Sequence, residues 1–175
     1  MKKAFANILI TVIAFSFCSC KRKVDMGKYN LIFVYNPSTK IDFKSKIVKV
    51  KFYRLNYQDT LKLSETEKAK IINSFFENKL YDLKRGEFYA DKVDISIPND
   101  FTVEIFEYGK LQSKITIDAT CSNKNHLPFG EKYHAVAFRD DVLPILKKDK
   151  ELIKALDTLE KYTSWLWRSH MTNFK

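Results

Sequence analysis

The sequence predicts an α+β fold, a single domain in which an antiparallel sheet has two or more helices packed on one face. Apolar and polar residues alternate along several short segments, as they do in half-buried antiparallel strands. Other segments repeat apolar residues at the three- and four-residue spacing of amphipathic helices. The 175 residues are 45% hydrophobic, enough for one packed core with little room for a second. The order of segments, with helices separated by runs of strands, favours the α+β class.

Two short segments predict the first strands. Residues 31–35 are continuously apolar and are followed by Asn36-Pro37-Ser38, which is typical of a strand end. Residues 47–53 alternate, as in a strand with one face in the core. The residues expected in the core are Val48, Val50 and Phe52, and those expected in solvent are Lys49 and Lys51.

A helix is predicted to begin at Ser64. Residues 64–67, Ser-Glu-Thr-Glu, form a capping box, in which the Ser64 hydroxyl and the Glu67 carboxylate each satisfy a free backbone N–H group. Apolar residues at helical spacing then predict a face that packs on the sheet. This face comprises Ala69, Ile72, Phe75, Phe76 and Leu80, opposite Lys68, Lys70 and Asn78.

Further strands are expected in the second half of the chain. Residues 101–119 alternate on both sides of Gly109, which can supply the positive φ of a tight turn, so they predict a β-hairpin. Residues 93–97 alternate before Pro98, and residues 133–138 are expected to form another strand.

A second helix is predicted from Asp141 onward. Asp141 is a suitable N-cap, and Pro144 would fall in the first turn, where its missing N–H costs little. The expected apolar stripe comprises Leu146, Leu152, Ile153, Leu156 and Leu159.

The first twenty residues have the layout of an export signal, with Lys2 and Lys3 before an apolar run that is shorter than a membrane span. Residues 17–20, Phe-Cys-Ser-Cys, resemble the lipobox of bacterial lipoproteins, although Phe17 and Cys18 depart from the usual residues. The resemblance implies cleavage before Cys20 and acylation of its sulfur and amino group, a lasting membrane anchor. A plain secretory signal or an uncleaved anchor is the alternative.

This resemblance implies three regions: a signal peptide (1–19), a basic tether (20–29) and a globular domain (30–175). In such lipoproteins an acidic residue after the acylated cysteine favours the inner membrane. Lys21 follows Cys20 here, so the resemblance favours the outer membrane of the cell envelope.

The basic charge of the chain suits an anionic partner, and the alternative is that it serves solubility alone. The chain carries 31 Lys and Arg against 21 Asp and Glu, and removal of residues 1–19 leaves a formal charge of +8. Export argues against nucleic acid as the partner, whereas an acidic protein, an acidic glycan or lipid headgroups remain.

Catalytic residue types cluster only at Asp118, Cys121, His126 and His134. Cys121 and His134 are candidates for a nucleophile and its base. The alternative is a buried thiol, because Cys121 continues the alternation of the preceding strand. The same group offers ligand types for zinc, but its spacing matches no compact metal motif, so we expect neither a metal nor a cofactor.

Other catalytic classes find little support in the sequence. The four glycines are too widely spaced for a dinucleotide-binding fingerprint, a P-loop or a nucleophile elbow. Pairs of nearby carboxylates, Asp91 with Asp94 and Glu104 with Glu107, do not by themselves define a glycosidase cleft.

The C-terminal segment is rich in aromatic residues and includes Trp165 and Trp167. Because they are two residues apart on a helix, they point in different directions, and we expect one of them to be buried. Both are candidates for a contact with a partner or a membrane, since exposed Trp is a frequent contact anchor.

These observations favour a lipid-anchored envelope protein that binds or scaffolds rather than catalyses. An envelope immunity protein that neutralises an acidic toxin is one alternative. A hydrolase that uses Cys121 and His134 is another.

The lipobox resemblance leads to the first testable prediction. Cys20→Ala is expected to release soluble protein or to leave unprocessed precursor, because no other cysteine lies at a suitable cleavage site. Membrane fractionation and the mass of the N-terminal peptide measure this. Unchanged membrane retention with normal processing would contradict it.

Overall fold

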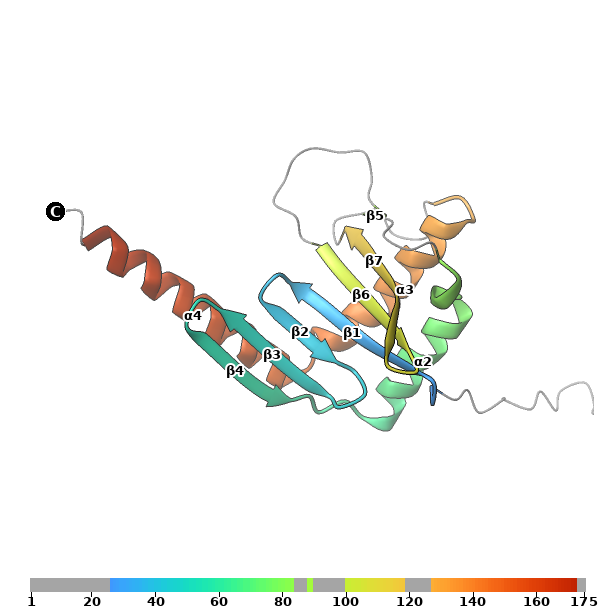
Figure 1. The fold of residues 1–175 in the computed structure, drawn as a ribbon, viewed down its shortest axis with the longest axis horizontal. Helices are drawn as coiled ribbons and strands as arrows, with labels where there is room; N and C mark the ends of the chain where they lie inside the picture. Colours follow the sequence, from blue (N-terminus) through green and yellow to red (C-terminus); the bar gives the residue numbers. More distant parts are fainter. Residues whose placement is uncertain (1–25, 84–87, 90–99, 119–126, 173–175) are drawn as a thin grey trace, which may run out of the picture.

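The computed structural model describes residues 26–83, 88–89, 100–118 and 127–172 (Figure 1). The strands are β1 (Tyr29–Asn36), β2 (Thr39–Asp42), β3 (Ile47–Phe52), β4 (Leu55–Thr60), β5 (Phe88–Tyr89), β6 (Asp100–Glu107) and β7 (Lys110–Asp118). The helices are α2 (Glu65–Glu77), the short 3₁₀-helix η1 (Leu80–Asp82), α3 (Glu131–Leu146) and α4 (Lys150–Thr172). The predicted α+β fold with an antiparallel sheet in a single domain is confirmed.

The sheet is built around β1. Its strand order is β4-β3-β2-β1-β6-β7-β5, and all neighbours are antiparallel except the short β5, which runs parallel to β7. β1 pairs with β2 on one side and with β6 on the other. It therefore joins the meander β2–β4 to the hairpin β6–β7.

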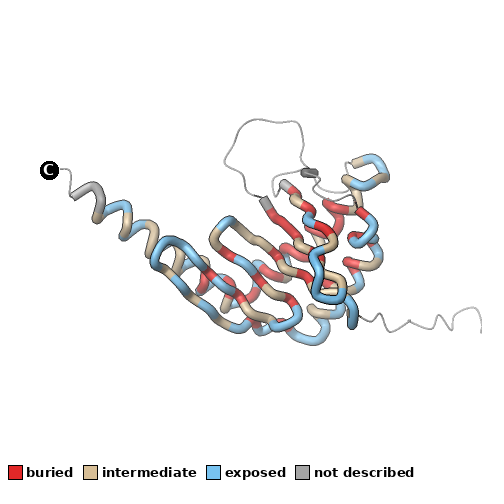
Figure 2. Tube along the Cα trace, in the orientation of Figure 1, coloured by how far each residue is buried: buried red, intermediate tan, exposed pale blue. Residues whose placement is uncertain are grey.

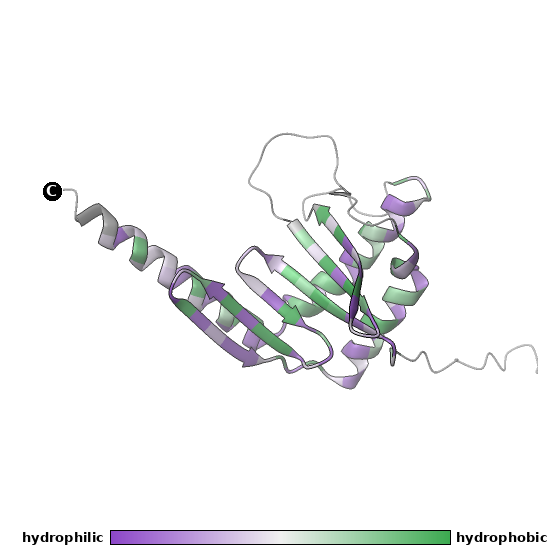
Figure 3. Ribbon diagram, in the orientation of Figure 1, coloured by the Kyte–Doolittle hydropathy of each residue, from purple (hydrophilic) through white to green (hydrophobic). Residues whose placement is uncertain are grey.

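One face of this sheet carries the core. Facing residues such as Phe33, Ile41 and Val103 are fully buried, while their neighbours along the strands are more exposed (Figures 2 and 3). The Phe33 ring lies 5.7 Å from that of Phe101 and 6.3 Å from that of Phe138 on α3. Phe33 thus connects the centre of the sheet to a helix.

The three described α-helices all contribute residues to this core, but each packs against different elements. α3 and α4 lie behind the sheet in the view of Figure 1, and α4 contacts β3 and β4. α2 packs on α3 and meets β1 through Tyr29, whose ring lies 5.2 Å from that of Phe75. Tyr29, the last residue of the expected tether, is therefore already part of the packed domain.

Several local predictions are confirmed. The capping box at Ser64 is present, with both of its hydrogen bonds. The hairpin turn between β6 and β7 holds Tyr108 at φ 48° and Gly109 at φ 76°, the pair of positive φ values of a type I′ turn. In β3, Val48 and Val50 are buried, while Lys49 and Lys51 are exposed, as predicted.

Phe52 corrects the prediction for the end of β3, because it is 37% exposed. It is the last residue of the strand, directly before the turn at Tyr53, where the chain reverses into β4. Alternation places Phe52 on the core face, but this end of the hairpin extends past the well-buried part of the core.

The buried face of α2 also differs from the prediction. Ile71, Ser74, Phe75 and Asn78 are buried, whereas Ala69 is exposed and Ile72 and Phe76 are half-buried. The helix packs against α3 as well as under the sheet, so its buried face includes polar residues that bond across the helix pair. Leu80 is buried as predicted, but it lies in η1 beyond the end of α2.

The strand predicted over residues 133–138 is wrong, because this segment lies inside α3. The two alanines favour a helix. The buried residues also recur at helical spacing, through Phe138, Val142 and Leu146. The apolar run was too short for its periodicity to separate a buried strand from a buried helix.

The predicted helix start at Asp141 is also wrong, because the helix that contains residues 133–138 has already begun at Glu131. Asp141 lies within α3, and Pro144 lies in its last turn rather than in a first turn. α4 begins separately after Asp149, with Leu152 buried, Leu156 and Leu159 half-buried, and Ile153 44% exposed. The expected stripe is therefore divided between two helices.

The predicted strand at residues 93–97 lies outside the described residues.

The core leads to a second testable prediction. Phe33→Ala is expected to lower the free energy of unfolding by about 3–5 kcal/mol, since it removes a fully buried ring at the centre of the sheet. Phe52→Ala, its matched control on the same sheet, is expected to cost clearly less because its ring is partly in solvent. Denaturant melts measure both, and a larger loss for Phe52→Ala would contradict the assignment.

Candidate binding surfaces

The face of the sheet opposite the buried core, which we call the open face, carries exposed lysines. Register places Lys40 directly opposite Lys49, with Lys51 two residues further along β3, and Lys114 lies on the same face of β7. All four side chains are exposed. We call Lys40, Lys49, Lys51 and Lys114 the lysine face. Like charges in directly opposed positions are unfavourable in a sheet, so this arrangement favours a bound anion.

Acidic residues on this face neutralise it only in part. Glu104 lies 3.5 Å from Lys40, measured from carboxylate oxygen to Nζ. Asp42 accepts hydrogen bonds from the Asn30 side chain and from backbone N–H groups in the turn after β2. Register also places Asp100 of β6 and Asp118 of β7 on this face, away from β3. Neither Lys49 nor Lys51 forms an ion pair with an acidic side chain within the described ranges, so the β3 part of the face retains positive charge.

The centre of the open face is less polar than its border. Ile32 and Val34 of β1 are half-buried there, and Thr102 and Thr116 share a hydrogen bond of 3.0 Å between their hydroxyl groups. An apolar centre with a charged border is the usual composition of a protein–protein interface.

A second surface lies at the end of α4, which extends beyond the sheet (Figure 1). We call Lys161–Thr172 the α4 tail. Trp165 is 56% exposed and Trp167 is 73% exposed, and the Trp165 ring lies 5.7 Å from that of Tyr162. The expectation that one of these tryptophans is buried is therefore wrong, because the sheet ends before the helix does.

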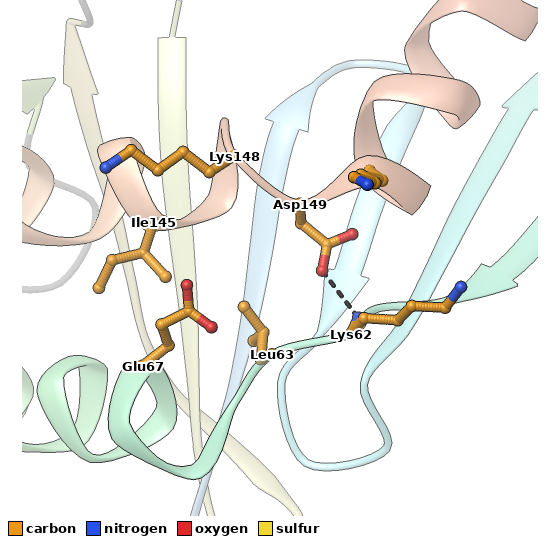
Figure 4. Close-up of a pocket in the computed structure, with 7 residues that line it drawn as sticks. Lys62, Leu63, Glu67, Ile145, Lys148 and Asp149 are labelled. Carbon is orange, nitrogen blue, oxygen red and sulfur yellow. Dashed lines mark hydrogen bonds between the residues drawn. The ribbon is translucent and has the colours of Figure 1, made fainter.

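A cavity of about 320 Å³ lies where the α3–α4 corner meets the segment between β4 and α2 (Figure 4). Asp149, which is 7% exposed, points into this corner. Its carboxylate accepts hydrogen bonds from the backbone N–H groups of Lys62 (2.7 Å), Glu151 (2.9 Å) and Leu152 (3.1 Å). Asp149 thus caps α4 and fastens it to the chain leaving β4.

The second carboxylate of this cavity, Glu67, is also occupied by structural contacts. It accepts hydrogen bonds from the Ser64 hydroxyl (2.7 Å) and the Ser64 backbone N–H (2.8 Å), which lower the pKa of Glu67. Both carboxylates of the cavity therefore cap helices, and these structural roles explain their positions without a bound ligand.

α4 is attached to β4 by a second polar contact. Asp59 accepts hydrogen bonds from the Tyr57 hydroxyl (2.8 Å) and from Nζ of Lys154 (3.1 Å). The Thr60 backbone N–H, followed by these two donors, lowers the pKa of Asp59. Partial burial raises the pKa of Tyr57, and its bond to Asp59 adds to that shift. These bonds hold α4 along the edge strand, with the tail beyond it.

A partly buried polar contact joins α2 to α3. The Ser74 hydroxyl donates to Asp141 at 2.8 Å, and the Asn78 side-chain amide donates to the Ser74 hydroxyl at 3.1 Å. Asp141 was expected to cap a helix and instead bonds to a neighbouring one. Ser74 was not singled out from the sequence, and the expectation that Asn78 lies on the face opposite the apolar residues is wrong, because the helix pair makes both residues interior.

The proposed catalytic pair is not assembled in the described part of the chain. His134 lies on α3, where its ring contacts those of Phe129 (4.9 Å) and Tyr133 (5.6 Å), and its buried Nδ1 has no hydrogen-bond partner among the described residues. Cys121 and His126 lie outside the described residues, as do Asp91 and Asp94. Glu104 and Glu107 each form an ion pair with a lysine, Lys40 and Lys28 respectively.

The described residues contain neither a metal-binding cluster nor a membrane-spanning helix. No group of three or more His, Cys, Asp or Glu side chains is placed to hold a metal ion. None of the helices there has both the length and the apolar character needed to cross a bilayer.

Comparison with known proteins found no protein family, curated protein or solved structure that matches this chain.

Asp149 is the structural residue that sequence analysis missed, and its signal is present in the chain. An aspartate that precedes Lys150-Glu151 and an apolar residue at position 152 is a typical N-cap pattern. The pattern was hidden because the preceding apolar residues of α3 were joined to those of α4 as one helix.

The third testable prediction concerns this corner. Asp149→Ala is expected to lower the free energy of unfolding by about 2–4 kcal/mol, because it removes a helix cap and leaves the Lys62 N–H, in a partly buried hydrogen bond, without its acceptor. Asp157→Ala, an exposed position on the same helix, serves as the matched control and is expected to change stability by less than about 0.5 kcal/mol. Equal effects in thermal or denaturant melts would contradict the role of Asp149.

Proposed function

We propose that this protein is a lipid-anchored binding protein of the bacterial cell envelope, whose open sheet face holds an acidic protein. The observation that carries the proposal is the lysine face. Lys49 and Lys51 are exposed, lie on one strand face and have no ion pair with a described acidic residue. The anchor part of the proposal is supported by the lipobox resemblance at Cys20.

Charge complementarity argues for an acidic partner. Opposed lysines such as Lys40 and Lys49 repel each other, and an anionic surface placed across them relieves that repulsion. The net charge of the chain has the same sign, so it also steers an acidic partner toward the domain.

The apolar centre favours a protein over an acidic glycan. Ile32 and Val34 occupy the middle of the face, and their burial against a partner adds binding energy that a purely polyanionic chain does not gain. An acidic toxin is one member of this class of partner. If the partner is such a toxin, the chain is an immunity protein.

The tether places this face near the bilayer. From Cys20 to Tyr29 the chain reaches at most about 30 Å when extended. The sheet therefore meets partners close to the membrane surface. Lys28 does not contribute free charge to the tether, because it pairs with Glu107 at 2.8 Å.

The fourth testable prediction uses a photo-crosslinking residue at Val34 in intact cells. We expect crosslinking to one acidic envelope protein, identified by mass spectrometry. A crosslinking residue at Lys79, on the turn after α2, is the positional control and is expected to give no such product.

The identified protein is then purified and its affinity measured. Lys49→Glu with Lys51→Glu is expected to weaken binding about tenfold or more at low salt. Lys147→Glu with Lys148→Glu, exposed on the helix side, is the matched control and is expected to have little effect. Crosslinks to glycan or lipid instead, or equal effects of the two charge reversals, would overturn the proposal.

A further inference from the structure

The α4 tail differs from the rest of the chain in composition. From Lys161 to Lys175 the sequence contains no Asp and no Glu. Its charged residues are Lys161, Arg168 and Lys175, and its large apolar or aromatic residues are Tyr162, Trp165, Leu166, Trp167, Met171 and Phe174. Basic residues combined with Trp, Phe and Leu are typical of helices that lie in the membrane interface.

The helix sorts its leucines and its basic residues, up to Arg168, onto two sides. Leu152, Leu159 and Leu166 are seven residues apart and share one side of α4. The first is fully buried under the sheet, while the second and third are half-buried, so the stripe continues into the tail where the sheet no longer covers it.

The basic residues form the opposite side. Lys154, Lys161 and Arg168 are also seven residues apart, and each lies two positions after a leucine of the stripe, about 200° around the helix. Lys154 is fixed at Asp59 of β4, while Lys161 and Arg168 are exposed on the tail.

The two tryptophans border the apolar stripe. Trp165 and Trp167 precede and follow Leu166, so they lie about 100° to either side of it. Tryptophan prefers the level of the lipid headgroups, with its ring near the acyl chains and its N–H in contact with polar groups. A leucine stripe with Trp at both borders and Lys or Arg behind it fits that boundary.

We infer that the α4 tail lies in the headgroup region of an anionic phospholipid bilayer. Leu166 faces the acyl chains, Trp165 and Trp167 lie at the headgroup level, and Lys161 and Arg168 reach the phosphates and water. Each basic residue near an anionic surface adds about 1 kcal/mol of attraction. A second copy of the chain is disfavoured as the occupant, because two tails would bring together only like charges.

This contact is independent of the acyl anchor and of the lysine face. It adds a second point of attachment at the far end of the molecule from the start of β1 (Figure 1). A domain attached at both ends would be oriented on the membrane rather than turning freely on its tether.

The chain offers its own reporter, because Trp165 and Trp167 are its only tryptophans. The mature chain, residues 20–175 with Cys20→Ser so that no acyl group contributes, is added to vesicles of phosphatidylcholine with or without phosphatidylglycerol. We expect a blue shift of tryptophan emission and quenching by lipids with brominated acyl chains, only with the anionic vesicles, and less at high salt.

Matched variants locate the contact. Leu166→Asp is expected to weaken vesicle binding about tenfold or more. Ile153→Asp, an exposed apolar residue at the start of α4, is expected to bind as the parent does. Circular dichroism and melting temperature verify that both variants remain folded.

The remaining outcomes overturn the inference. These are no bromine quenching with anionic vesicles, equal loss in both variants, or a blue shift that depends on protein concentration without lipid, which would indicate a second copy. Loss of vesicle binding in Lys49→Glu with Lys51→Glu, with Leu166→Asp unaffected, would place the lipid contact on the sheet instead. The protein tested here has no acyl group, so vesicle binding tests only the tail. The anchor at Cys20 is tested separately by the membrane fractionation of Cys20→Ala.

Discussion

The pairing of β1 with both β2 and β6 is the constraint on which the rest of the structure depends. The meander β2–β4 and the hairpin β6–β7 meet only through β1, so its two ladders make one sheet out of two pieces. Phe33 strengthens this junction, because its ring touches Phe43 and Phe101 on either side and Phe138 from α3. The burial of a single face then leaves the other face open to solvent.

The direction of α4 follows from polar contacts rather than from apolar packing alone. Asp149 caps the helix and holds the Lys62 backbone, and Asp59 holds Lys154 one turn further on. Asp149 lies at the α3–α4 corner and Asp59 lies on β4, so α4 leaves the corner along β4 and passes the edge of the sheet. The tail of α4 is therefore exposed because the helix is longer than the strand along which it packs.

The two proposed surfaces use the same excess of basic charge in different ways. On the sheet, lysines surround a half-buried centre of Ile32 and Val34, a composition suited to a protein partner. On the tail, Lys161 and Arg168 lie behind a stripe bordered by tryptophans, a composition suited to lipid. An anionic bilayer beside an acyl-anchored domain would attract both surfaces, but only the tail offers aromatic residues for insertion.

Local structure could be predicted from the sequence because it depends on residues that are close together in the chain. The capping box at Ser64, the turn at Gly109 and the alternation of Val48 and Val50 each need only a few neighbours, and all are present. The apolar run at residues 133–138 was misread because a short buried segment has no polar face to reveal its period.

What the sequence by itself determined is the fold class, the strands around residues 31–35, 47–53 and 101–118, and the excess of basic charge. Only the tertiary structure decided which of these residues are available for contact. Helix packing made Ser74 and Asn78 interior, and the short edge of the sheet left both tryptophans in solvent, because burial depends on which elements meet and where each one ends.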